Sequence, residues 1–438
     1  MVDYANDEGI SNAEVNKISK DKICMLTSGH PALDARIFHK ESVSLQRAGY
    51  EVTVLAPLNK EGVFVDLSGN KIADGETVVN GIRLMGFNRG RERFSKTDNA
   101  LLLLSLVNLG RLKFWREPLA ELVDKGAMLR ADVYHCHELW SLYAGIQIKK
   151  ILAREGRETK LIYDVHEFRP AASSDSIKNR FLRRILRAII ARYEKKALIH
   201  TDYVITANQI TRGLLLAMNR FIRNEVVYNC PIISTIEVQR GSQTHKDKLT
   251  ICHEGTLHFN RGLKQMVGVM KVLKERYDSK VELLIVGDVF GKEREYLENM
   301  LGEENLHDVI RRTGWLPYER VGEAISQADV GIIFMEPTEN NMLAGPPNKL
   351  FNYMQCGIPI VSVDLPETSR IIYKTQCGLI ARDKSVESLA GALSALIDDA
   401  DRRRRMGTNA KRAVNSQYSW EQMEKNLLRV YDDLLSKP

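Results

Sequence analysis

The sequence predicts an α/β protein with two doubly wound domains, each built on a parallel sheet. Short buried-strand patterns alternate with helical patterns along most of the 438 residues, and this alternation is typical of parallel strands covered by helices. The length suggests two or three domains. A polar stretch at 233–248, "ISTIEVQRGSQTHKDK", interrupts the series and predicts the linker between the two domains.

The first series opens with a strand, a helix and a second strand. These are "KICMLTSG", "DARIFHKESVSLQRAG" and "YEVTVLAP", with Gly49 ending the helix. Two buried strands joined by one helix need a crossover connection, so a parallel βαβ unit is expected. Four further strands are predicted at 131–137, 160–167, 201–208 and 224–230.

The second series forms a domain of similar size. Its predicted strands lie at 249–255, 281–288, 309–316, 328–336 and 358–364, with helices beginning at Gly262, Lys292, Tyr318 and Asn348. The last segment, 419–438, predicts a helix capped by Ser419 whose apolar stripe packs back on the N-terminal domain. The expected order is therefore a flexible leader (1–20), a first domain (21–232), the linker (233–248), a second domain (249–418) and the returning helix (419–438).

Composition places the chain among ordinary globular proteins. Hydrophobic residues make up 44% and charged residues 27%, and the net charge is +7. The charge fits an anionic ligand, an anionic membrane surface or simply a basic surface. The six cysteines show no Cys-x-x-Cys pair, which favours reduced thiols in a cytoplasmic protein. The polar start does not resemble a signal peptide, and the apolar run from Ala100 is too short to span a bilayer.

A basic amphipathic helix is predicted at 177–196. Its apolar stripe, which includes Phe181 and Leu182, is flanked by arginines. Such a helix can lie on an anionic membrane surface. A helix packed on the core with a solvated basic back explains the pattern equally well, and the sequence leaves both interpretations open.

Candidate site residues follow the predicted strands, because ligands of open α/β sheets bind beyond the carboxyl ends of the strands. We expect His135 and His137 to point to opposite faces of their strand, so that His137 lines a site and His135 is buried structure. Further candidates are Asp34, Arg36, Glu138, His166, Glu167 and Glu336.

Two helix starts in the second domain carry cations. Arg261 and Lys264 stand at a glycine-containing turn, and Lys349 stands at the start of the helix from Asn348. Backbone amides and the helix dipole favour anions at such ends, so the pair predicts a diphosphate site. The chain contains neither a Gly-x-Gly-x-x-Gly after the first strand nor a Walker loop, which argues against a dinucleotide oxidoreductase or a P-loop enzyme.

In combination, several motifs resemble the GT-B glycosyltransferases of family GT4. They are "DVYHCHE", "YDVHE", the Gly-x-x-x-x-x-Arg-Gly turn from Gly255, "LLIVGD", "GWLPYERV", "ADVGIIF", "PNKLFNYMQCGIPIV" and "YSWE". The likeness runs from about Lys22 to the C-terminus. It implies two Rossmann-like domains facing across a cleft, with the acceptor bound by the first and a nucleotide-sugar, a UDP- or GDP-sugar, by the second.

The resemblance also assigns roles to residues. It implies that Arg261 neutralises the leaving diphosphate, that His137 lies near the transferred sugar and that Gly29 lets backbone amides approach the diphosphate. It implies a retaining transfer without a metal ion or other cofactor. The donor-binding set that it implies is Gly29, Gly255, Thr256, Lys264, Gly287, Asn348, Lys349, Leu350 and Asn352. The acceptor or sugar side that it implies is Asp34, Arg36, Glu138, His166, Glu167 and Glu336.

The chain departs from the family at two glutamates. Family members often carry Glu-x7-Glu, with the first glutamate near the donor sugar and the second on the ribose, where this chain has Ala344 and Asn352. Asn352 can still exchange hydrogen bonds with ribose hydroxyls. Because Ala344 cannot bind a sugar hydroxyl, Glu336, Glu339 or a backbone amide near 343–345 would have to contact the donor sugar instead.

The main hypothesis is a transferase that builds a cell-surface glycan or a lipid-linked oligosaccharide. It would be cytoplasmic and peripheral on the inner face of the membrane, with a glycan or lipid-linked acceptor and no nucleic acid partner. Two alternatives stay open at this point. One is a nucleotide-sugar epimerase or hydrolase of the same fold, and the other is a catalytically impaired subunit that regulates a partner transferase.

Overall fold

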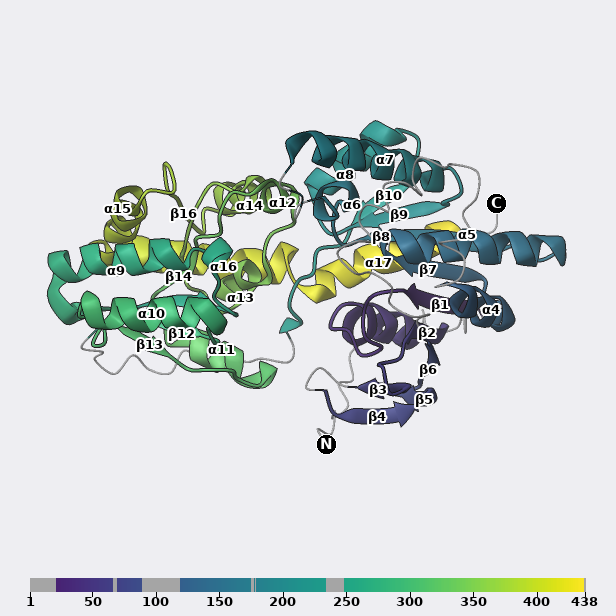
Figure 1. Cartoon of the computed structure of the whole chain (residues 1–438), viewed down its shortest axis with the longest axis horizontal. Coiled ribbons are helices and arrows are strands. Elements are labelled where there is room, and N and C mark those ends of the chain that lie inside the picture. Colours follow the sequence, from purple (N-terminus) through teal and green to yellow (C-terminus); the bar gives the residue numbers. More distant parts are fainter. Residues whose placement is uncertain are drawn as a thin grey trace. The chain divides into compact units, whose positions relative to one another are not determined.

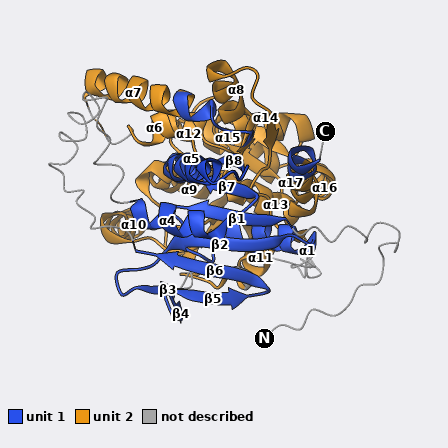
Figure 2. Ribbon diagram, turned by 90° about the vertical axis from the view of Figure 1, so that its right-hand side faces the viewer, with its two compact units in different colours: residues 1–164, 196–204, 430–438 blue, residues 165–195, 205–429 orange. Residues whose placement is uncertain are grey.

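The computed structural model describes residues 21–65, 69–88, 119–174, 177, 179–233 and 248–436. The chain divides into two compact units (Figure 2): unit 1 holds 1–164, 196–204 and 430–438, and unit 2 holds 165–195 and 205–429. These extents differ from the expected domains, because 165–195 and 205–232 group with unit 2. The predicted leader and nearly all of the predicted linker lie outside the described residues.

The larger sheet has eight strands in the order β10-β9-β8-β7-β1-β2-β6-β5. Strands β1, β2, β6, β7 and β8 run parallel, and β5 is antiparallel to β6. Every strand predicted for the first series is present. The bounds are β1 Lys22–Thr27, β2 Glu51–Pro57, β5 Glu76–Val79, β6 Ile82–Phe87, β7 Val133–His137, β8 Lys160–Val165, β9 Tyr203–Thr206 and β10 Asn224–Val226.

Strands β5 and β6 and the separate two-stranded sheet of β3 (Val63–Val65) and β4 (Lys71–Asp74) were not predicted from the sequence. Residues of β4 and β5 are intermediate or exposed, so the region lacks the continuous apolar run of a buried parallel strand. The helix predicted within 34–49 is present as η1 Ile37–Ser42 and α1 Val43–Arg47, and the basic helix predicted at 177–196 is present as α7 Arg180–Leu198. The other helices of this half, whose positions were not predicted, are α4 Ala120–Leu129, α5 Glu138–Arg154, α6 Arg169–Ala172 and α8 Gln209–Met218.

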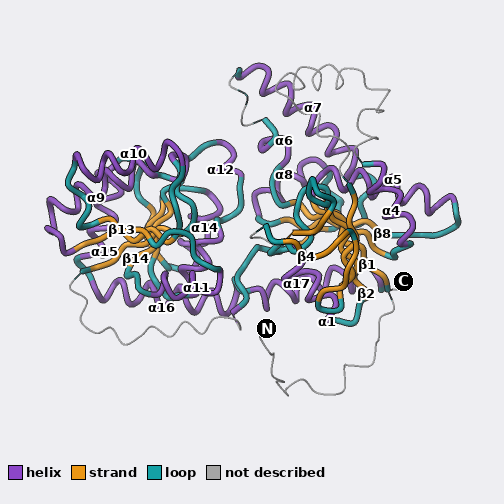
Figure 3. Tube along the Cα trace, turned by 60° about the horizontal axis from the view of Figure 1, so that its bottom comes forward, coloured by secondary structure: helices purple, strands orange, loops and turns teal. Residues whose placement is uncertain are grey.

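The second sheet lies wholly in unit 2 and has six strands in the order β13-β12-β11-β14-β15-β16. All of its paired strands are parallel. The strands lie at the centre of this part of the chain, with helices around them (Figure 3). Their bounds are β11 Leu249–Glu254, β12 Val281–Val286, β13 Ile310–Arg312, β14 Val330–Ile333, β15 Ile360–Ser362 and β16 Gly378–Ile380.

The helices of this half complete the α/β alternation (Figure 1). The first of them follows the central strand β11 through a short turn, so its N-terminus lies near the carboxyl edge of the sheet. The bounds are η3 Phe259–Arg261, α9 Leu263–Tyr277, η4 Asp278–Lys280, α10 Gly291–Glu303, α11 Tyr318–Ser326, α12 Glu339–Leu343, α13 Asn348–Gln355, α14 Pro366–Thr375, α15 Val386–Ile397 and α16 Ala400–Gln417.

The final helix, α17, spans Trp420–Leu435. Ser419 caps it as predicted, because its hydroxyl accepts a hydrogen bond from the backbone N–H of Gln422 at 3.4 Å. Its last residues, from Val430, belong to unit 1, where Val430 and Tyr431 are fully buried. Within the described ranges, no helix combines the length and the apolar character needed to cross a bilayer.

Candidate functional site

The carboxyl ends of three neighbouring strands meet at one edge of the larger sheet. In the pairing register, His137 of β7 lies beside Thr27 of β1 on one side and beside Asp164 of β8 on the other. Parallel pairing therefore gathers polar residues that are far apart in the sequence. They lie where ligands of open α/β sheets bind.

Behind this edge lies a buried cluster of charged residues. The Nη2 atom of Arg36 donates hydrogen bonds to Asp164 at 3.1 Å (Oδ1) and 2.9 Å (Oδ2). Its Nε atom lies 2.9 Å from Oε1 of Glu41. Arg36 is 4% exposed, and Asp164 and Glu41 are fully buried. Burial alone would lower the pKa of Arg36, but the two carboxylates hold it above its usual value.

The prediction that His135 and His137 face opposite ways is wrong. Their rings stack with centroids 4.5 Å apart and an angle of 14° between the planes. Neighbouring residues of a strand alternate between its faces, so residues two apart share a face. His135 is buried as expected, but His137 is fully buried as well. Both rings lie beside Asp164, at 3.7 Å from His135 Nε2 and 3.5 Å from His137 Nδ1.

The C-terminal helix reaches this cluster through one hydroxyl. Tyr431 Oη lies 2.8 Å from Nδ1 of His135, and its ring packs beside Tyr50 with centroids 5.6 Å apart. Because the imidazole of His135 stacks on that of His137, Tyr431 fixes the orientation of the pair. The end of α17 thus contributes to the environment of the predicted active-site histidine.

The cluster also has the residue types of a metal centre. Glu41, His135, His137 and Asp164 bring one possible ligand atom each to within 4.8 Å of one another. However, two stacked and nearly parallel imidazoles do not direct their nitrogens to one point, and Arg36 already supplies a cation to both carboxylates. Burial raises the pKa of Glu41, the positive charge of Arg36 lowers it, and the neighbouring Asp164 raises it further. We interpret the group as an ion-pair cluster that contains its own cation.

In front of the cluster, Glu138 holds the loop that contains Gly29. Glu138 accepts hydrogen bonds from Thr27 Oγ1 at 3.2 Å and from Ser28 Oγ at 3.0 Å. A Cβ on Gly29 would lie 3.0 Å from the Glu138 carboxylate, so a side chain there would displace it. Glu138 itself has a φ of 73°, which is strained for a residue with a side chain.

A charged histidine sits between two acids in this loop. His30 lies 3.0 Å from Glu138 through Nε2 and 3.2 Å from Asp34 through Nδ1. Burial alone would lower the pKa of His30, but the bonds to Asp34 and Glu138 raise it to about 10. His30 is therefore an imidazolium at neutral pH. Asp34 also accepts hydrogen bonds from the backbone N–H groups of Arg36 and Ile37, at 2.8 and 3.0 Å.

In unit 2, two glycine turns and a cation meet at the edge of the second sheet. Gly255 follows β11 with a φ of 93°, and a Cβ placed there would be 3.8 Å from Nη1 of Arg261. Gly287 follows β12, and a Cβ there would lie 2.6 Å from the carbonyl oxygen of Gly255. Two of the predicted donor residues, Gly255 and Gly287, are thus brought together with Arg261, the cation expected at the leaving diphosphate.

Helix α13 places Lys349 behind this turn. Lys349 is 5% exposed, and its Nζ atom lies 3.4 Å from Nε2 of His253. Burial lowers the pKa of Lys349 to about 7, although Glu254 opposes the shift and Arg261 adds to it. Burial, together with Lys349 and Arg261, also lowers the pKa of His253 well below its usual value, so His253 is neutral.

The other predicted residues lie in varied places. Lys264 lies over the rings of Phe259 and Tyr296, at 5.2 and 5.9 Å from the centroids. Glu336 pairs with Lys384 at 2.7 Å and accepts a hydrogen bond from Gln265. Thr256 and His166 are partly exposed, Glu167 is exposed, and Leu350 is fully buried. Asn348 does not cap α13, whose N-cap is Pro347, and it accepts a hydrogen bond from Asn229 instead.

From the sequence, Glu254 was a residue at a predicted strand end with no role assigned to it. Nδ2 of Asn352 donates a hydrogen bond to Oε1 of Glu254 at 2.8 Å. Residues 254 and 352 are far apart in the sequence, and no local pattern indicates this pairing. The only sequence feature that could have indicated a role for Glu254 was its position at the end of a predicted strand, next to Gly255.

Family models match both halves of the chain. Residues 35–230 match the model described as "Glycosyl transferase 4-like domain", and residues 235–413 match "Glycosyl transferases group 1". Together with the two parallel-sheet units, these matches define a glycosyltransferase of the GT-B fold. The chain belongs to the GT4-like glycosyltransferases.

Individual relatives are distant. The chain is 22% identical to the uncharacterized glycosyltransferase MJ1069 of Methanocaldococcus jannaschii over 75% of this chain and 81% of that one. It is 22% identical to the amylovoran biosynthesis glycosyltransferase AmsK of Erwinia amylovora, over 42% of this chain and 47% of that one, so this match spans about half of the relative. Anabaena Alr3699/HepE, solved in complex with UDP, superposes with a TM-score of 0.63 at 14% identity, covering 94% of this chain and 100% of that one.

Proposed function

We propose that the protein moves a sugar from a UDP- or GDP-sugar to a glycan or lipid-linked acceptor of cell-surface polysaccharide synthesis. The observation that carries this proposal is Arg261 beside Gly255 and Gly287 at the carboxyl edge of the second sheet. Solved structures of Alr3699/HepE with UDP and with UDP-glucose support a nucleotide-sugar donor. The amylovoran relative supports the role in polysaccharide synthesis.

The donor's diphosphate would be bound by fixed charges of the chain. Glycine turns let backbone N–H groups approach phosphate oxygens, and Arg261 and Lys349 supply positive charge on the same side of the sheet. The negative charge that develops on the leaving diphosphate is then stabilised by groups already in place. This arrangement supports transfer without a metal ion, and we propose retained anomeric configuration from the resemblance to the GT4 family alone.

In unit 1, the proposed sugar and acceptor contacts differ from those the sequence indicated. His137 and Arg36 are buried, whereas His30 and Glu138 are partly exposed beside Gly29. We therefore assign the contacts with substrate to the loop that carries Gly29, His30 and Asp34. The buried cluster holds the strand ends behind it.

A donor screen tests this function. The full chain would be heated with UDP-, GDP- and dTDP-sugars in the presence of EDTA, and a saturable rise of the unfolding midpoint with one of them is expected. The same donor is then incubated without an acceptor. Rapid release of free sugar or of an epimer would contradict transfer, and no stabilisation by any donor would contradict donor binding.

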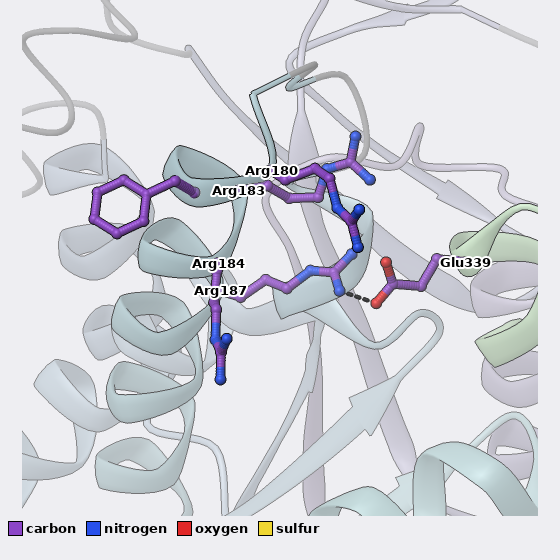
Figure 4. Close-up of a pocket in the computed structure, with 6 residues that line it drawn as sticks. Arg180, Arg183, Arg184, Arg187 and Glu339 are labelled. Atoms are coloured by element: carbon purple, nitrogen blue, oxygen red, sulfur yellow. Dashed lines mark ion pairs between the residues drawn. The ribbon is translucent and has the colours of Figure 1, made fainter.

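We further propose that helix α7 holds the enzyme on an anionic bilayer, at the inner face of the cell membrane. Its first turns line a hollow of about 450 Å³ with Arg180, Arg183, Arg184 and Arg187 (Figure 4). Phe181 is 71% exposed beside them. Exposed aromatic residues among arginines are typical of helices that lie in a bilayer interface.

Two of these arginines also hold the local structure. Arg187 pairs with Glu339 of α12 (Figure 4), and Arg183 donates hydrogen bonds to the carbonyl of Ile177 at 2.9 and 2.7 Å. Among the described contacts, Arg180 and Arg184 have no such bond. These two arginines are the better residues to change.

Sedimentation with vesicles tests the membrane contact. Wild type should sediment with phosphatidylglycerol vesicles, less so at high salt, whereas the double variant Arg180→Glu, Arg184→Glu should stay in solution. Arg404→Glu on the exposed face of α16 is the matched control. Equal binding by the α7 variant and wild type would contradict this role.

A further inference from the structure

The side chain of Glu254 is held by helix α13 at the end of the central strand β11. Asn352 donates to its Oε1 atom at 2.8 Å. The hydroxyl of Tyr353 accepts a hydrogen bond from the backbone N–H of Glu254 at 2.9 Å and donates one to the carbonyl of Cys252 at 3.1 Å. Two consecutive helix residues therefore fix one strand-end residue, which is more than a surface carboxylate requires.

The second oxygen of this carboxylate, Oε2, is buried and accepts no hydrogen bond within the part of the chain that the structure describes. Buried carboxylate oxygens are nearly always hydrogen-bonded in folded proteins. The residue as a whole is partly exposed, and the terminal torsion of a glutamate is soft. A small rotation therefore presents this oxygen to a ligand at the edge of the sheet.

The neighbours of Glu254 indicate which ligand group would fit. Lys349 interacts electrostatically with Glu254 and with Arg261, and Gly255, which follows Glu254 directly, lies beside Arg261. A phosphate oxygen would be repelled by the carboxylate and attracted by the two cations. A hydroxyl group, in contrast, can donate a hydrogen bond to Oε2. The part of a ligand that meets Glu254 is therefore a hydroxylated ring next to the phosphates.

We propose that Glu254, positioned by Asn352, binds a vicinal diol of the donor, on the ribose or on the transferred sugar. This inference rests on the proposed function. In this arrangement the carboxylate that binds the diol comes from Glu254 on strand β11. The amide of Asn352 on helix α13 orients this carboxylate.

Calorimetric titration of the full chain tests this assignment. The ligands are UDP, GDP, their 2′-deoxy forms, UDP-glucose and GDP-mannose. Glu254→Gln should weaken binding of the preferred ribonucleotide by about tenfold, the loss expected for one hydrogen bond to a charged group. Its unfolding midpoint should stay near that of wild type, because Asn352 can also donate to a glutamine.

A matched control distinguishes this site from a general effect of losing a buried carboxylate. Glu282 lies near the start of β12 and accepts hydrogen bonds from Thr250 and Arg311, each at 3.0 Å. It is 16% exposed. Glu282→Gln should leave nucleotide binding unchanged.

Reciprocal exchange gives the sharpest test. Asn352→Glu alone places two carboxylates in contact and should weaken binding through repulsion. The double variant Glu254→Gln, Asn352→Glu restores one carboxylate and one amide in reversed positions, and its affinity should return to within about threefold of wild type. A double variant as weak as the sum of its two single changes would contradict a shared diol site.

The ligands separate the two sources of the diol. If Glu254→Gln binds UDP more weakly than wild type does but binds 2′-deoxy-UDP almost as well, the diol is that of the ribose. If the variant loses affinity only for UDP-glucose or GDP-mannose, the diol is that of the transferred sugar. If Glu254→Gln loses affinity equally for every ligand, or for none of them, this inference is overturned, whereas the proposal that the protein binds a nucleotide still stands. If wild type binds none of the six ligands, the proposed function fails and this inference fails with it.

Discussion

Arg36 and Asp164 form a fully enclosed ion pair, with Nη2 of the guanidinium 3.1 and 2.9 Å from the two carboxylate oxygens. The pair joins the segment after β1 to the end of β8. It also lies directly behind the strand ends that carry the candidate site.

Replacing Asp164 by Asn should destabilise the protein strongly. Arg36 would keep its charge in a buried position with Glu41 as its remaining carboxylate partner, and breaking a buried pair in this way typically costs about 3–5 kcal/mol. The midpoint of thermal unfolding measures the effect.

Glu155→Gln is the matched control for that change. It breaks the ion pair of Arg130 and Glu155, whose side chains are 51% and 46% exposed, and should cost less than about 1 kcal/mol. Similar losses for the two variants would show that the buried cluster contributes no more than a surface pair.

Gly262 is expected to tolerate no side chain. It has a φ of 91°, and a Cβ there would lie 2.1 Å from the backbone oxygen of Phe334. Gly262→Ala should therefore shift the start of α9, lower the unfolding midpoint and weaken donor binding through the adjacent Arg261. Gly302→Ala in helix α10, where a Cβ meets nothing within 4 Å, should instead stabilise by up to about 1 kcal/mol. Unchanged stability of the Gly262 variant would contradict the close contact.

Donor affinity should depend on pH through Lys349. In the free protein, burial lowers the pKa of Lys349 to about 7. Arg261 also lowers this pKa, whereas Glu254 and, to a smaller extent, Cys252 raise it. A bound diphosphate favours the charged amine and so raises its pKa in the complex. Affinity is then greatest below pH 7 and falls as the pH rises above 7, by at most tenfold per pH unit.

Titration with a nucleotide-sugar from pH 6 to pH 9 measures this dependence, because the phosphates of such a donor do not titrate in that range. Lys349→Arg keeps the charge and should flatten the profile. The neighbouring His253 is neutral throughout, since its pKa lies well below the usual value. A wild-type profile that stays flat would mean that Lys349 does not meet the diphosphate.

The sequence was enough to place six of the eight strands of the larger sheet and five of the six strands of the second, because parallel strands buried on both faces leave continuous apolar runs such as "VELLIV" in β12. It did not reveal β4 and β5, whose half-exposed residues carry no such run, and it also missed β3, β6 and β16. It also indicated the turn that places Arg261 beside Gly255, since both residues belong to one local motif. Local patterns therefore predicted what local geometry determines.

What the sequence missed depends on contacts between distant residues. The pairing of Asn352 with Glu254 and of Tyr431 with His135 arises only after the sheets have formed. The burial of His137 follows from Arg36, Glu41 and Asp164 meeting around it, and no single segment shows this. The opposite-face expectation for the two histidines failed for a simpler reason, because residues two apart on a strand share a face.

The measurement that tests the central claim most directly is a titration of wild type and Arg261→Gln with the donor found in the screen, in the presence of EDTA. Arg276→Gln, at the far end of helix α9 where its side chain donates to Ser394 at 2.6 Å, serves as the control. Saturable binding by wild type and the control, with affinity at least about tenfold weaker for Arg261→Gln, is the predicted result. Equal binding by all three proteins, or binding that disappears for wild type with EDTA, would contradict a metal-independent donor site at Arg261.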